Sequence, residues 1–227
     1  MLSFGQVILM LTVAVMSGCG LSGGAMANGD VRNVELPTIE SNAPEPKGEQ
    51  TAVFAGGCFW GVEAVFESMK GVIDVKSGYS GGTAETANYD MVSDGETDHA
   101  EAVIVRYDPT KVTYIQLLSV FFSVVHDPTE VNRQGPDIGR QYRSAIFYAD
   151  EAQKKAAEAY IKAIDDAKVL KKKVATQVVP LVKFYDAEEY HQNYLVRNPT
   201  QPYIVAHDLP KLEALKKKFP DLYVEKK

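Results

Sequence analysis

The sequence predicts an α/β (α+β) fold, a two-layer sandwich built on a mixed β-sheet. Runs of β-branched and aromatic residues alternate with amphipathic helical runs, although the alternation is irregular. Glycine-rich turns of the kind that join hairpins separate some of the strands. Once an N-terminal leader and tether are set aside, about 180 residues remain, which is enough for one sizeable core. We therefore expect one domain over residues 51–227, with its helices packed on the sheet.

The stretch Thr51–Phe66 opens this domain with a predicted strand, tight turn and helix. The β-rich run 52–55 meets two glycines, after which Cys58 precedes a helical apolar pattern. Unpaired N–H groups and the positive end of the helix dipole stabilise an anion at this position. We therefore expect Cys58 to ionise more easily than a free cysteine and to act as a nucleophile. The same residues also fit a buried, inert cysteine behind a glycine turn.

The next two strands are predicted at Val72–Tyr79 and Glu101–Tyr107, the second of which alternates cleanly between apolar and polar residues. Between them, residues 78–82 read as a glycine-rich turn, and residues 83–100 are polar and irregular. This part of the chain therefore contributes two strands joined by a long polar connection.

A capping box predicts where the following helix begins. Thr113 is followed three residues later by Gln116, so that each side chain can bond the backbone N–H of the other. Apolar side chains recur at helical spacing from Ile115 to Val125. Residues 126–143 then form a long loop, and such a loop in a compact domain is usually functional.

The rest of the chain again alternates strand and helix. Pro180 places one strand near an edge of the sheet, because proline cannot donate a ladder hydrogen bond. Asp186 and Glu189 have the spacing of a second helix cap. The predicted elements are a strand at Ser144–Ala149, an amphipathic helix at Asp150–Lys173, a strand at Thr176–Tyr185, and helices at Asp186–Leu195 and Pro210–Phe219.

Residues 1–18 are typical of a secretory signal peptide of the lipoprotein type. Residues 4–16 form an apolar run that is too short to span a bilayer comfortably. The run MSGC at residues 16–19 resembles a bacterial lipoprotein processing site, at which Cys19 is lipidated. The alternative is plain secretion after cleavage near Ala27. We favour the lipoprotein, and so expect an exported, periplasmic protein anchored to the membrane through Cys19.

Residues 19–50 are expected to form a flexible tether between this leader and the domain. They are rich in Gly, Pro, Asn, Ser and Glu and carry few large apolar side chains. Such a segment cannot bury enough apolar surface to fold. A chain of this kind has a typical reach of roughly 30 Å, which would hold the domain away from a membrane surface.

Composition argues against several other classes of protein. The net charge of −6 and the lack of a basic stripe make nucleic acid an unexpected partner. Cys58 is the only thiol within residues 51–227, so no disulfide can form inside the domain. His99, His126 and His191 lack the spacing of metal ligands, and we expect them to be structural rather than metal-binding.

Five motifs together carry a resemblance to a known family. They are GGCFWGVE at 56–63, GYSGG at 78–82, HAE at 99–101, HDPTEVNRQGPDIGRQYRSAIFY at 126–148 and EEYHQNYL at 188–195. In order and spacing the chain from Thr51 to about Tyr203 resembles a peptide methionine sulfoxide reductase of the A class. The resemblance implies a two-layer α/β sandwich, for which we expect a ferredoxin-like core. It also implies reduction of the S epimer of methionine sulfoxide, in peptides and free.

The resemblance assigns roles to individual residues. Cys58 matches the nucleophile and Glu101 the proton donor of the family. The substrate-binding residues it implies are Phe59 and Trp60 around the methyl group, Tyr89 and Tyr142 at the sulfoxide oxygen, and Asp137 as a further acid.

The chemistry of a sulfoxide suits these residue types. Its methyl group is apolar and its S=O oxygen is a strong acceptor, so an aromatic wall and hydroxyl or carboxyl donors can bind it. Attack on sulfur by the Cys58 thiolate pushes charge onto oxygen, where donors stabilise the transition state. Glu101 can donate only while protonated, which burial would favour. Without the resemblance, Glu101 would read as a surface charge, the two tyrosines as rim or core residues, and Asp137 as a brace for a glycine turn.

The chain departs from the family pattern at its C-terminal end. Many members carry extra cysteines there that resolve the sulfenic acid as an intramolecular disulfide, and this chain has none after Tyr203. We therefore expect a monomeric enzyme without a cofactor whose Cys58 sulfenic acid is reduced by an external thiol, either a thioredoxin-like protein or a small thiol. Its expected substrates are oxidised proteins and peptides that carry methionine sulfoxide.

Two rival interpretations stay open at this point. Cys58 with His191 or His126 as base would make a cysteine hydrolase or acyltransferase. A lipoprotein that binds Met-rich or aromatic partners through Phe59 and Trp60 would need no catalysis. The first requires a cysteine–histidine pair, and the second tolerates loss of the Cys58 thiol.

Overall fold

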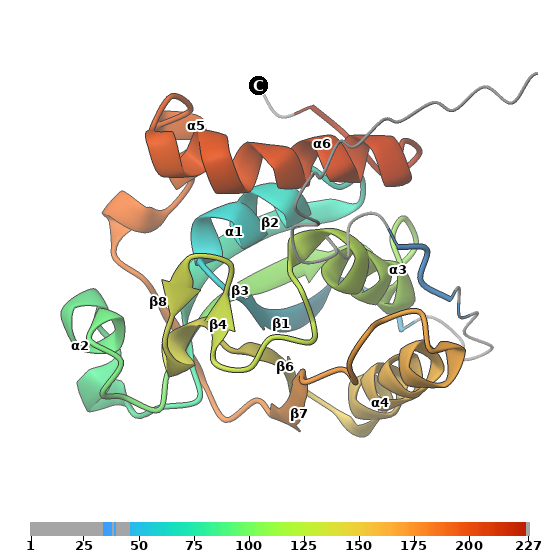
Figure 1. The fold of residues 1–227 in the computed structure, drawn as a ribbon, viewed down its shortest axis with the longest axis horizontal. Coiled ribbons are helices and arrows are strands. Elements are labelled where there is room, and N and C mark those ends of the chain that lie inside the picture. The colour runs from blue at the N-terminus through green and yellow to red at the C-terminus, as the bar shows by residue number, and fades with distance from the viewer. Residues whose placement is uncertain (1–33, 38, 40–45, 226–227) are drawn as a thin grey trace, which may run out of the picture.

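A mixed six-stranded sheet forms the centre of the molecule, in the order β7-β6-β1-β3-β2-β8 (Figure 1). Neighbouring strands are antiparallel except β6 and β7, which are parallel. This computed structural model describes residues 34–37, 39 and 46–225, so the predicted signal peptide and Cys19 lie outside the described residues. The strands are β1 Gln50–Gly56, β2 Val72–Ser80, β3 Ala100–Tyr107, β6 Ser144–Tyr148, β7 Gln177–Pro180 and β8 Phe184–Asp186, and a separate hairpin pairs β4 Arg133–Gln134 with β5 Asp137–Ile138.

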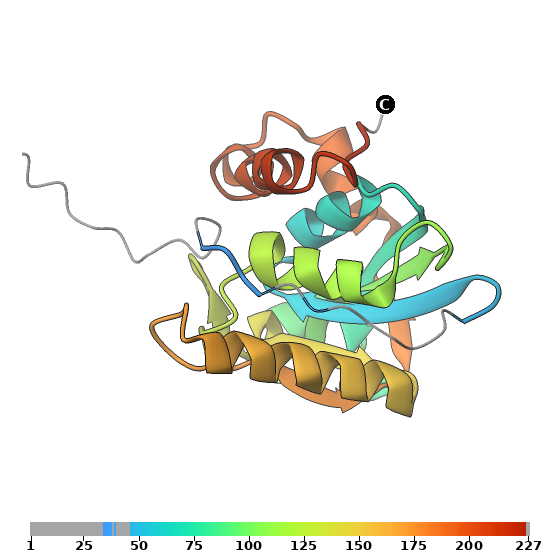
Figure 2. The ribbon, with the colours of Figure 1, turned by 90° about the vertical axis from the view of Figure 1, so that its right-hand side faces the viewer.

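Helices pack around this sheet, with α6 lying on α1 at one end and α4 beside β6 and β7 at the other (Figure 2). The helices are α1 Phe59–Glu67, α2 Tyr89–Ser93, α3 Tyr114–Val120, α4 Glu151–Ala167, α5 Tyr194–Arg197 and α6 Leu209–Lys218. A π-helical segment, Phe121–Val125, continues α3, and another, Ile204–Asp208, leads into α6. Among the described residues, no helix combines the length and the apolar character needed to cross a bilayer.

The larger hydrophobic core joins one face of the sheet to the helices. Phe54 of β1 is fully buried there and stacks on Phe66 of α1 and on Phe121 after α3, with ring centroids 5.1 and 5.0 Å apart. Tyr160 of α4 stacks on Phe122 in the same cluster. Aromatic pairs of this kind contribute about 0.5–1.5 kcal/mol each beyond the area they bury. The core therefore fixes α1, and the turn before it, against the sheet.

The opposite face of the sheet carries small side chains and is strongly curled. Pro180 ends β7 and Phe184 begins β8, yet these strands lie at opposite edges of the sheet. The chain from Pro180 to Phe184 has four Cα-to-Cα steps, which span at most about 15 Å. A flat sheet of six strands would be about 24 Å wide. The sheet must curl to bring its edges that close, and small residues on the inner face leave room for it. This cluster consists of Val53, Ala55, Ala100, Ala102, Ala145 and Phe147, with Leu181 and Phe184 packed against it.

The α/β class, the mixed sheet and most of the predicted strands are confirmed. The capping box at Thr113 is present in both directions, since its hydroxyl accepts from the Gln116 N–H at 3.2 Å and its own N–H donates to Gln116 at 2.8 Å. The regions predicted as loops contain short elements: α2 lies within 83–100, and the β4–β5 hairpin lies within 126–143. These elements are too short to show a periodic pattern.

Three predictions in the last third of the chain are wrong in extent. The helix expected to reach Lys173 ends at Ala167, because Lys168 adopts a left-handed backbone with φ 53°. The single strand expected at Thr176–Tyr185 is the two edge strands β7 and β8. The helix expected from Asp186 is replaced by a 3₁₀ turn, Glu189–His191, and the short α5, with a left-handed Asn193 between them.

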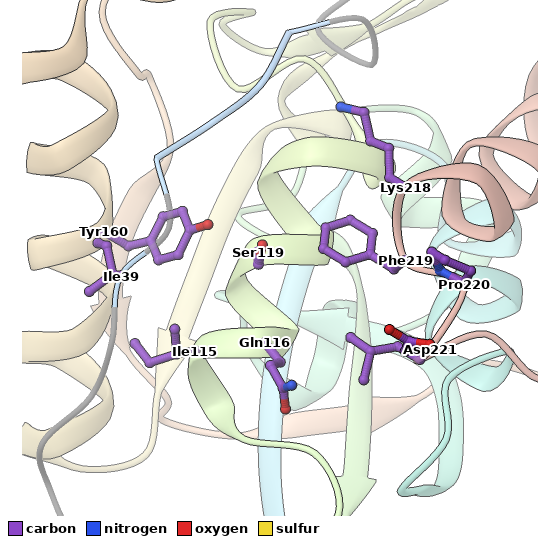
Figure 3. Close-up of a pocket in the computed structure, with 10 residues that line it drawn as sticks. Ile39, Ile115, Gln116, Ser119, Tyr160, Lys218, Phe219, Pro220 and Asp221 are labelled. Atoms are coloured by element: carbon purple, nitrogen blue, oxygen red, sulfur yellow. The ribbon is translucent and has the colours of Figure 1, made fainter.

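Part of the segment predicted as a tether lies against the domain. Leu36 and Ile39 are partly buried on the larger core, and Lys218 Nζ donates to the Val34 carbonyl at 3.0 Å. A pocket of about 330 Å³ opens there between α3, α4 and the end of α6 (Figure 3). Its lining contains none of the predicted site residues and consists of Ile39, Ile115, Gln116, Ser119, Tyr160, Lys218, Phe219, Pro220, Asp221 and Leu222.

Candidate active site

Cys58 lies in the turn that joins β1 to α1. Gly57 takes a positive φ of 92°, and Cys58 is the N-cap of α1. A Cβ at Gly57 would come within 2.7 Å of Gln134, so only glycine lets the β4–β5 hairpin pack this closely beside the cysteine. Cys58 is buried but not sealed, with 8% of its surface exposed. The predicted strand, turn and helix are therefore present, and they leave a small part of Cys58 exposed.

The expectation that Cys58 ionises easily is wrong for the free enzyme. Burial raises the pKa of the Cys58 thiol well above its ordinary value, and the nearby acids Glu101 and Asp208 raise it further. The N–H of Trp60 in the first turn of α1 and the ammonium of Lys211 act in the opposite direction. The helix terminus thus favours the thiolate as expected, but desolvation and two acidic neighbours outweigh it.

Glu101 is buried next to the first turn of α1. It projects from β3 with 2% of its surface exposed, and its Oε2 accepts the backbone N–H of Phe59 at 3.0 Å. Burial raises the pKa of Glu101 from 4.5 to about 8, and the Phe59 N–H lowers it by less. The predicted rise is confirmed, so Glu101 carries a proton at neutral pH.

Two phenols and an acid complete this polar side of the site. Burial raises the pKa of Tyr89 to about 12, and Glu101 and Cys58 are the next causes. Burial, Glu101, Asp137 and Cys58 together raise the pKa of Tyr142. The structure therefore brings together Tyr89 from α2, Tyr142 from the 3₁₀ turn Arg140–Tyr142 and Asp137 from β5, as the motifs predicted.

An aromatic wall lies on the other side. Phe59 is fully buried with its ring 5.1 Å from that of His191, and Trp60 stacks on Tyr194 with centroids 3.8 Å apart and planes 8° from parallel. Tyr203 stands edge-on to Trp60 and donates its hydroxyl proton to Asp137. The wall is therefore larger than the pair Phe59–Trp60 that the sequence predicted.

Glu188 and His191 hold this wall in place. Glu188 accepts the Tyr79 hydroxyl at 2.8 Å and the Tyr89 backbone N–H at 2.9 Å. The Trp60 indole N–H donates to His191 Nδ1 at 3.1 Å, which requires an unprotonated Nδ1. Burial also lowers the pKa of His191, so the imidazole is neutral. The motif EEYHQNYL contains both residues, but no pattern in the sequence predicts their contacts with Tyr79 and Trp60.

The arrangement of the histidines does not fit a cysteine hydrolase. His126 contacts the Phe121 carbonyl with Nδ1 at 3.1 Å and the Ser144 hydroxyl with Nε2 at 2.6 Å, and burial lowers its pKa to about 3. His191 Nδ1 is occupied by Trp60. His99 bonds the backbone at Gly82 and Thr83. Within the described residues no group of three or more His, Cys, Asp and Glu side chains could hold a metal ion.

Glu63 of α1 is a second buried acid, behind the wall. Its Oε2 accepts the Asn193 N–H at 2.9 Å and so anchors the loop that carries His191. Burial raises its pKa from 4.5 to about 7. The folded state thus holds the Glu63 carboxyl proton more tightly than the unfolded chain does. The contribution of protonated Glu63 to the stability of the fold is therefore complete below pH 4.5 and is lost as the pH rises towards 7.

Replacing Glu63 with glutamine should therefore change stability in a pH-dependent way. The amide oxygen can still accept from Asn193, but it has no charge to bury. We expect the difference in free energy of unfolding between Glu63→Gln and wild type to grow by about 2 kcal/mol, in favour of the variant, as the pH rises from 5 to 8. Urea unfolding at both pH values measures this, with the exposed Glu158→Gln as control. An equal effect at both pH values would contradict the assignment.

The site as a whole defines a class of protein. A thiol and a protonated carboxyl group lie beside phenolic hydroxyls and an aromatic wall. Such side chains can bind a small group that has an apolar end and an accepting oxygen, and a thiol is a group that can attack it. This combination describes a thiol-dependent oxidoreductase.

Comparison with known proteins agrees with this class. The model of the family "Peptide methionine sulfoxide reductase" matches residues 50–223. The chain is 52% identical over 187 residues to peptide methionine sulfoxide reductase MsrA 2 of Synechocystis, covering 82% of this chain and 87% of that one. It is 54% identical over 179 residues to MsrA 2 of Mesorhizobium japonicum, covering 79% and 92%.

Solved structures give the same result. The reduced form of Mxr1 from Saccharomyces cerevisiae is 36% identical with a TM-score of 0.64, covering 73% of this chain and 94% of that one. Methionine sulfoxide reductase A of Corynebacterium diphtheriae is 35% identical with a TM-score of 0.61, covering 69% and 78%. The chain belongs to the peptide methionine sulfoxide reductase family, A class. It is a peptide-methionine (S)-S-oxide reductase, which uses a thiol as reductant.

Proposed function

We propose that Cys58 attacks the sulfur of methionine-(S)-sulfoxide, in proteins and peptides and in the free amino acid, with Glu101 as the proton donor. A bond forms between Cys58 Sγ and the substrate sulfur while Glu101 protonates the oxygen. The oxygen is then transferred to Cys58, because the substrate S–O bond breaks while a bond forms between that oxygen and Sγ. The bond between Sγ and the substrate sulfur breaks at the same time, so methionine leaves with its electron pair and Cys58 is left as a sulfenic acid. The thiol proton of Cys58 replaces the one that Glu101 gave, so the site ends with its carboxyl group protonated.

The observation that carries this proposal is the protonated carboxyl group of Glu101, held by the Phe59 N–H one residue from Cys58. Because Glu101 is neutral near pH 7, it offers a proton where negative charge develops. Tyr89 and Tyr142 are assigned as further donors to the sulfoxide oxygen, and Asp137 as the acid that orients this side through Tyr203. Phe59 and Trp60 are assigned to the substrate methyl group, whose burial favours binding.

An external thiol is proposed to complete the cycle. The chain has two cysteines, Cys19 and Cys58, and no cysteine follows Tyr203. A donor thiolate attacks the Cys58 sulfenic acid and releases water, giving a mixed disulfide. A second thiol resolves it and restores Cys58. A thioredoxin-like protein or a small thiol fits this role, and the enzyme then repairs oxidised proteins as a monomer.

The leader and the finer details of the fold belong to the same proposal. We assign residues 1–18 to a lipoprotein signal and Cys19 to lipidation, which puts the domain in the periplasm on a tether. Uptake of a labelled lipid precursor that is lost in Cys19→Ala would support this, and uptake that survives the substitution would overturn it. A two-layer sandwich with a ferredoxin-like core is supported by the strand order β6-β1-β3-β2, with α1 and α3 in the crossings.

A single-turnover experiment tests the chemistry. Reduced enzyme mixed with a methionine-(S)-sulfoxide peptide, without any reductant, is expected to form one equivalent of methionine peptide and one sulfenic acid. Dimedone labelling and peptide mass spectrometry should locate the sulfenic acid at Cys58. The R epimer serves as the control and should give neither product. Turnover with the sulfenic acid on another residue, or without one, would contradict the proposal.

A further inference from the structure

The C-terminal tail carries a buried ion pair. Asp208 ends the π-helical segment before α6 and is fully buried, and Lys211 follows in the first turn of α6. Lys211 Nζ donates to Asp208 Oδ1 at 3.1 Å, with only 15% of the lysine side chain exposed. Desolvation makes such a pair a weak source of stability. Its placement therefore points to a different role.

The pair packs against the helix turn that Cys58 caps. A Cβ at Gly61, the third residue of α1, would lie 2.0 Å from Asp208 Oδ1 and 2.8 Å from Lys211 Nζ. The missing side chain thus lets both charges touch the turn that begins at Cys58. The other carboxyl oxygen, Asp208 Oδ2, is buried and has no hydrogen-bond partner among the described residues. An unpartnered oxygen in a low-dielectric site acts strongly on its neighbours.

The electrostatic effects on Cys58 have opposite signs. Asp208 raises the pKa of the Cys58 thiol, and Lys211 lowers it by less. Asp208 acts in the same direction on Glu101. The other titratable groups around Cys58 and this pair are Tyr89 from α2, Asp137 from β5, Tyr142 after β5, His126 after α3, and Tyr203 and His207 from the segment before α6. Burial raises the pKa of Asp208, and Lys211 opposes that rise. The tail therefore adds a buried carboxyl group and an ammonium group to a site that already holds a thiol and a carboxyl group.

We propose that Asp208 and Lys211 are positioning residues that control the charge state of Cys58, Asp208 keeping the thiol protonated in the free enzyme and Lys211 limiting that effect. This inference rests on the proposed function, in which Cys58 must survive oxidants between turnovers. A protonated thiol resists oxidation that a thiolate would undergo.

Lys211 also has a role when the mixed disulfide is cleaved. The second thiolate of the donor attacks the donor sulfur, the S–S bond to Cys58 breaks, and the donor becomes a disulfide. Cys58 leaves with the electron pair as a thiolate, and a better stabilised thiolate leaves faster. A positive charge beside the turn of Cys58 favours that step, which an enzyme without a resolving cysteine needs in every cycle.

The pH profile of Cys58 alkylation tests this directly. In a Cys19→Ala background Cys58 is the only thiol, so the rate of iodoacetamide labelling from pH 6 to 11 reports its ionisation. Asp208→Asn should move the profile to lower pH and speed labelling at pH 7 about tenfold, as a shift of one unit gives. Lys211→Met should slow labelling by a smaller factor, because Lys211 acts on Cys58 less strongly than Asp208 does. Lys211→Arg and the exposed Lys217→Met should match the parent.

Profiles of Asp208→Asn and Lys211→Met that coincide with the parent would overturn the inference. Should either single variant fail to fold, Asp208→Asn combined with Lys211→Met removes both charges together. Its profile is expected at lower pH than the parent, because the effect of Asp208 exceeds that of Lys211, and an unchanged profile would count against the pair. Labelling requires neither sulfoxide nor reductant. Failure of the proposed reductase chemistry would therefore leave these shifts intact, and the two ideas fail separately.

Discussion

Replacing Cys58 with serine is expected to abolish sulfoxide reduction. The serine hydroxyl has a similar size, so it should keep the turn between β1 and α1, but it is not ionised at any working pH and does not attack the sulfoxide sulfur. We expect kcat to fall at least about 10³-fold, the scale on which an activated nucleophile contributes. Peptide methionine formation with a dithiol donor, followed by chromatography, measures this.

The other cysteine provides the matched control. Cys19→Ser should keep full turnover with the same donor, because Cys58 is proposed to be recycled by an external thiol and not by a second cysteine of the chain. Loss of turnover in Cys19→Ser would mean that Cys19 resolves the sulfenic acid. Retention of turnover in a folded Cys58→Ser protein would end the assignment of the nucleophile.

Replacing Glu101 with glutamine is expected to slow the reaction while making Cys58 easier to ionise. Glutamine can accept the Phe59 N–H as Glu101 does, but it has no carboxyl proton to donate. We expect kcat to fall about 10²–10⁴-fold, as for loss of a general acid. Because the Glu101 charge raises the pKa of the Cys58 thiol, its removal should bring thiolate absorbance at 240 nm to lower pH.

The two readouts of Glu101→Gln separate a proton donor from a structural residue. A lower kcat together with easier ionisation of Cys58 indicates a missing proton donor, because turnover then falls although more of the nucleophilic thiolate is present. The exposed Glu158→Gln should change neither quantity. Unchanged kcat in Glu101→Gln, with the thiol titration shifted, would show that Glu101 only adjusts the charge of Cys58.

Local signals in the sequence predicted much of the site. The glycine turn before Cys58 and the alternating strand that begins at Glu101 are short-range patterns, and the structure follows them. The capping box at Thr113 is also local and is confirmed. The same spacing at Asp186 was misleading, because Asp186 lies in β8, where it pairs with Gly78 of β2 and binds Lys76 at 2.8 Å. Strand pairing across the molecule there overrides a local helix signal.

Contacts between distant segments could not be predicted. Tyr203, Asp208 and Lys211 reach the site only because the tail folds back over α1, and nothing in their local sequence indicates this. The prediction that Cys58 ionises easily was wrong for the same reason. The position at a helix N-terminus is a local feature, whereas its burial and the charges of Glu101 and Asp208 depend on the folded molecule.

The short link between β7 and β8 also bears on association between copies of the chain. An edge strand with a long row of free N–H and C=O groups is a template for intermolecular pairing. Here the edge strands have only four and three residues, and β7 contains Pro180, which lacks a donor. The curl leaves no straight, extended border on which a second chain could add a strand. The sheet is thereby guarded against growth into fibrillar aggregates, and the charged Asp186 in β8 acts in the same direction.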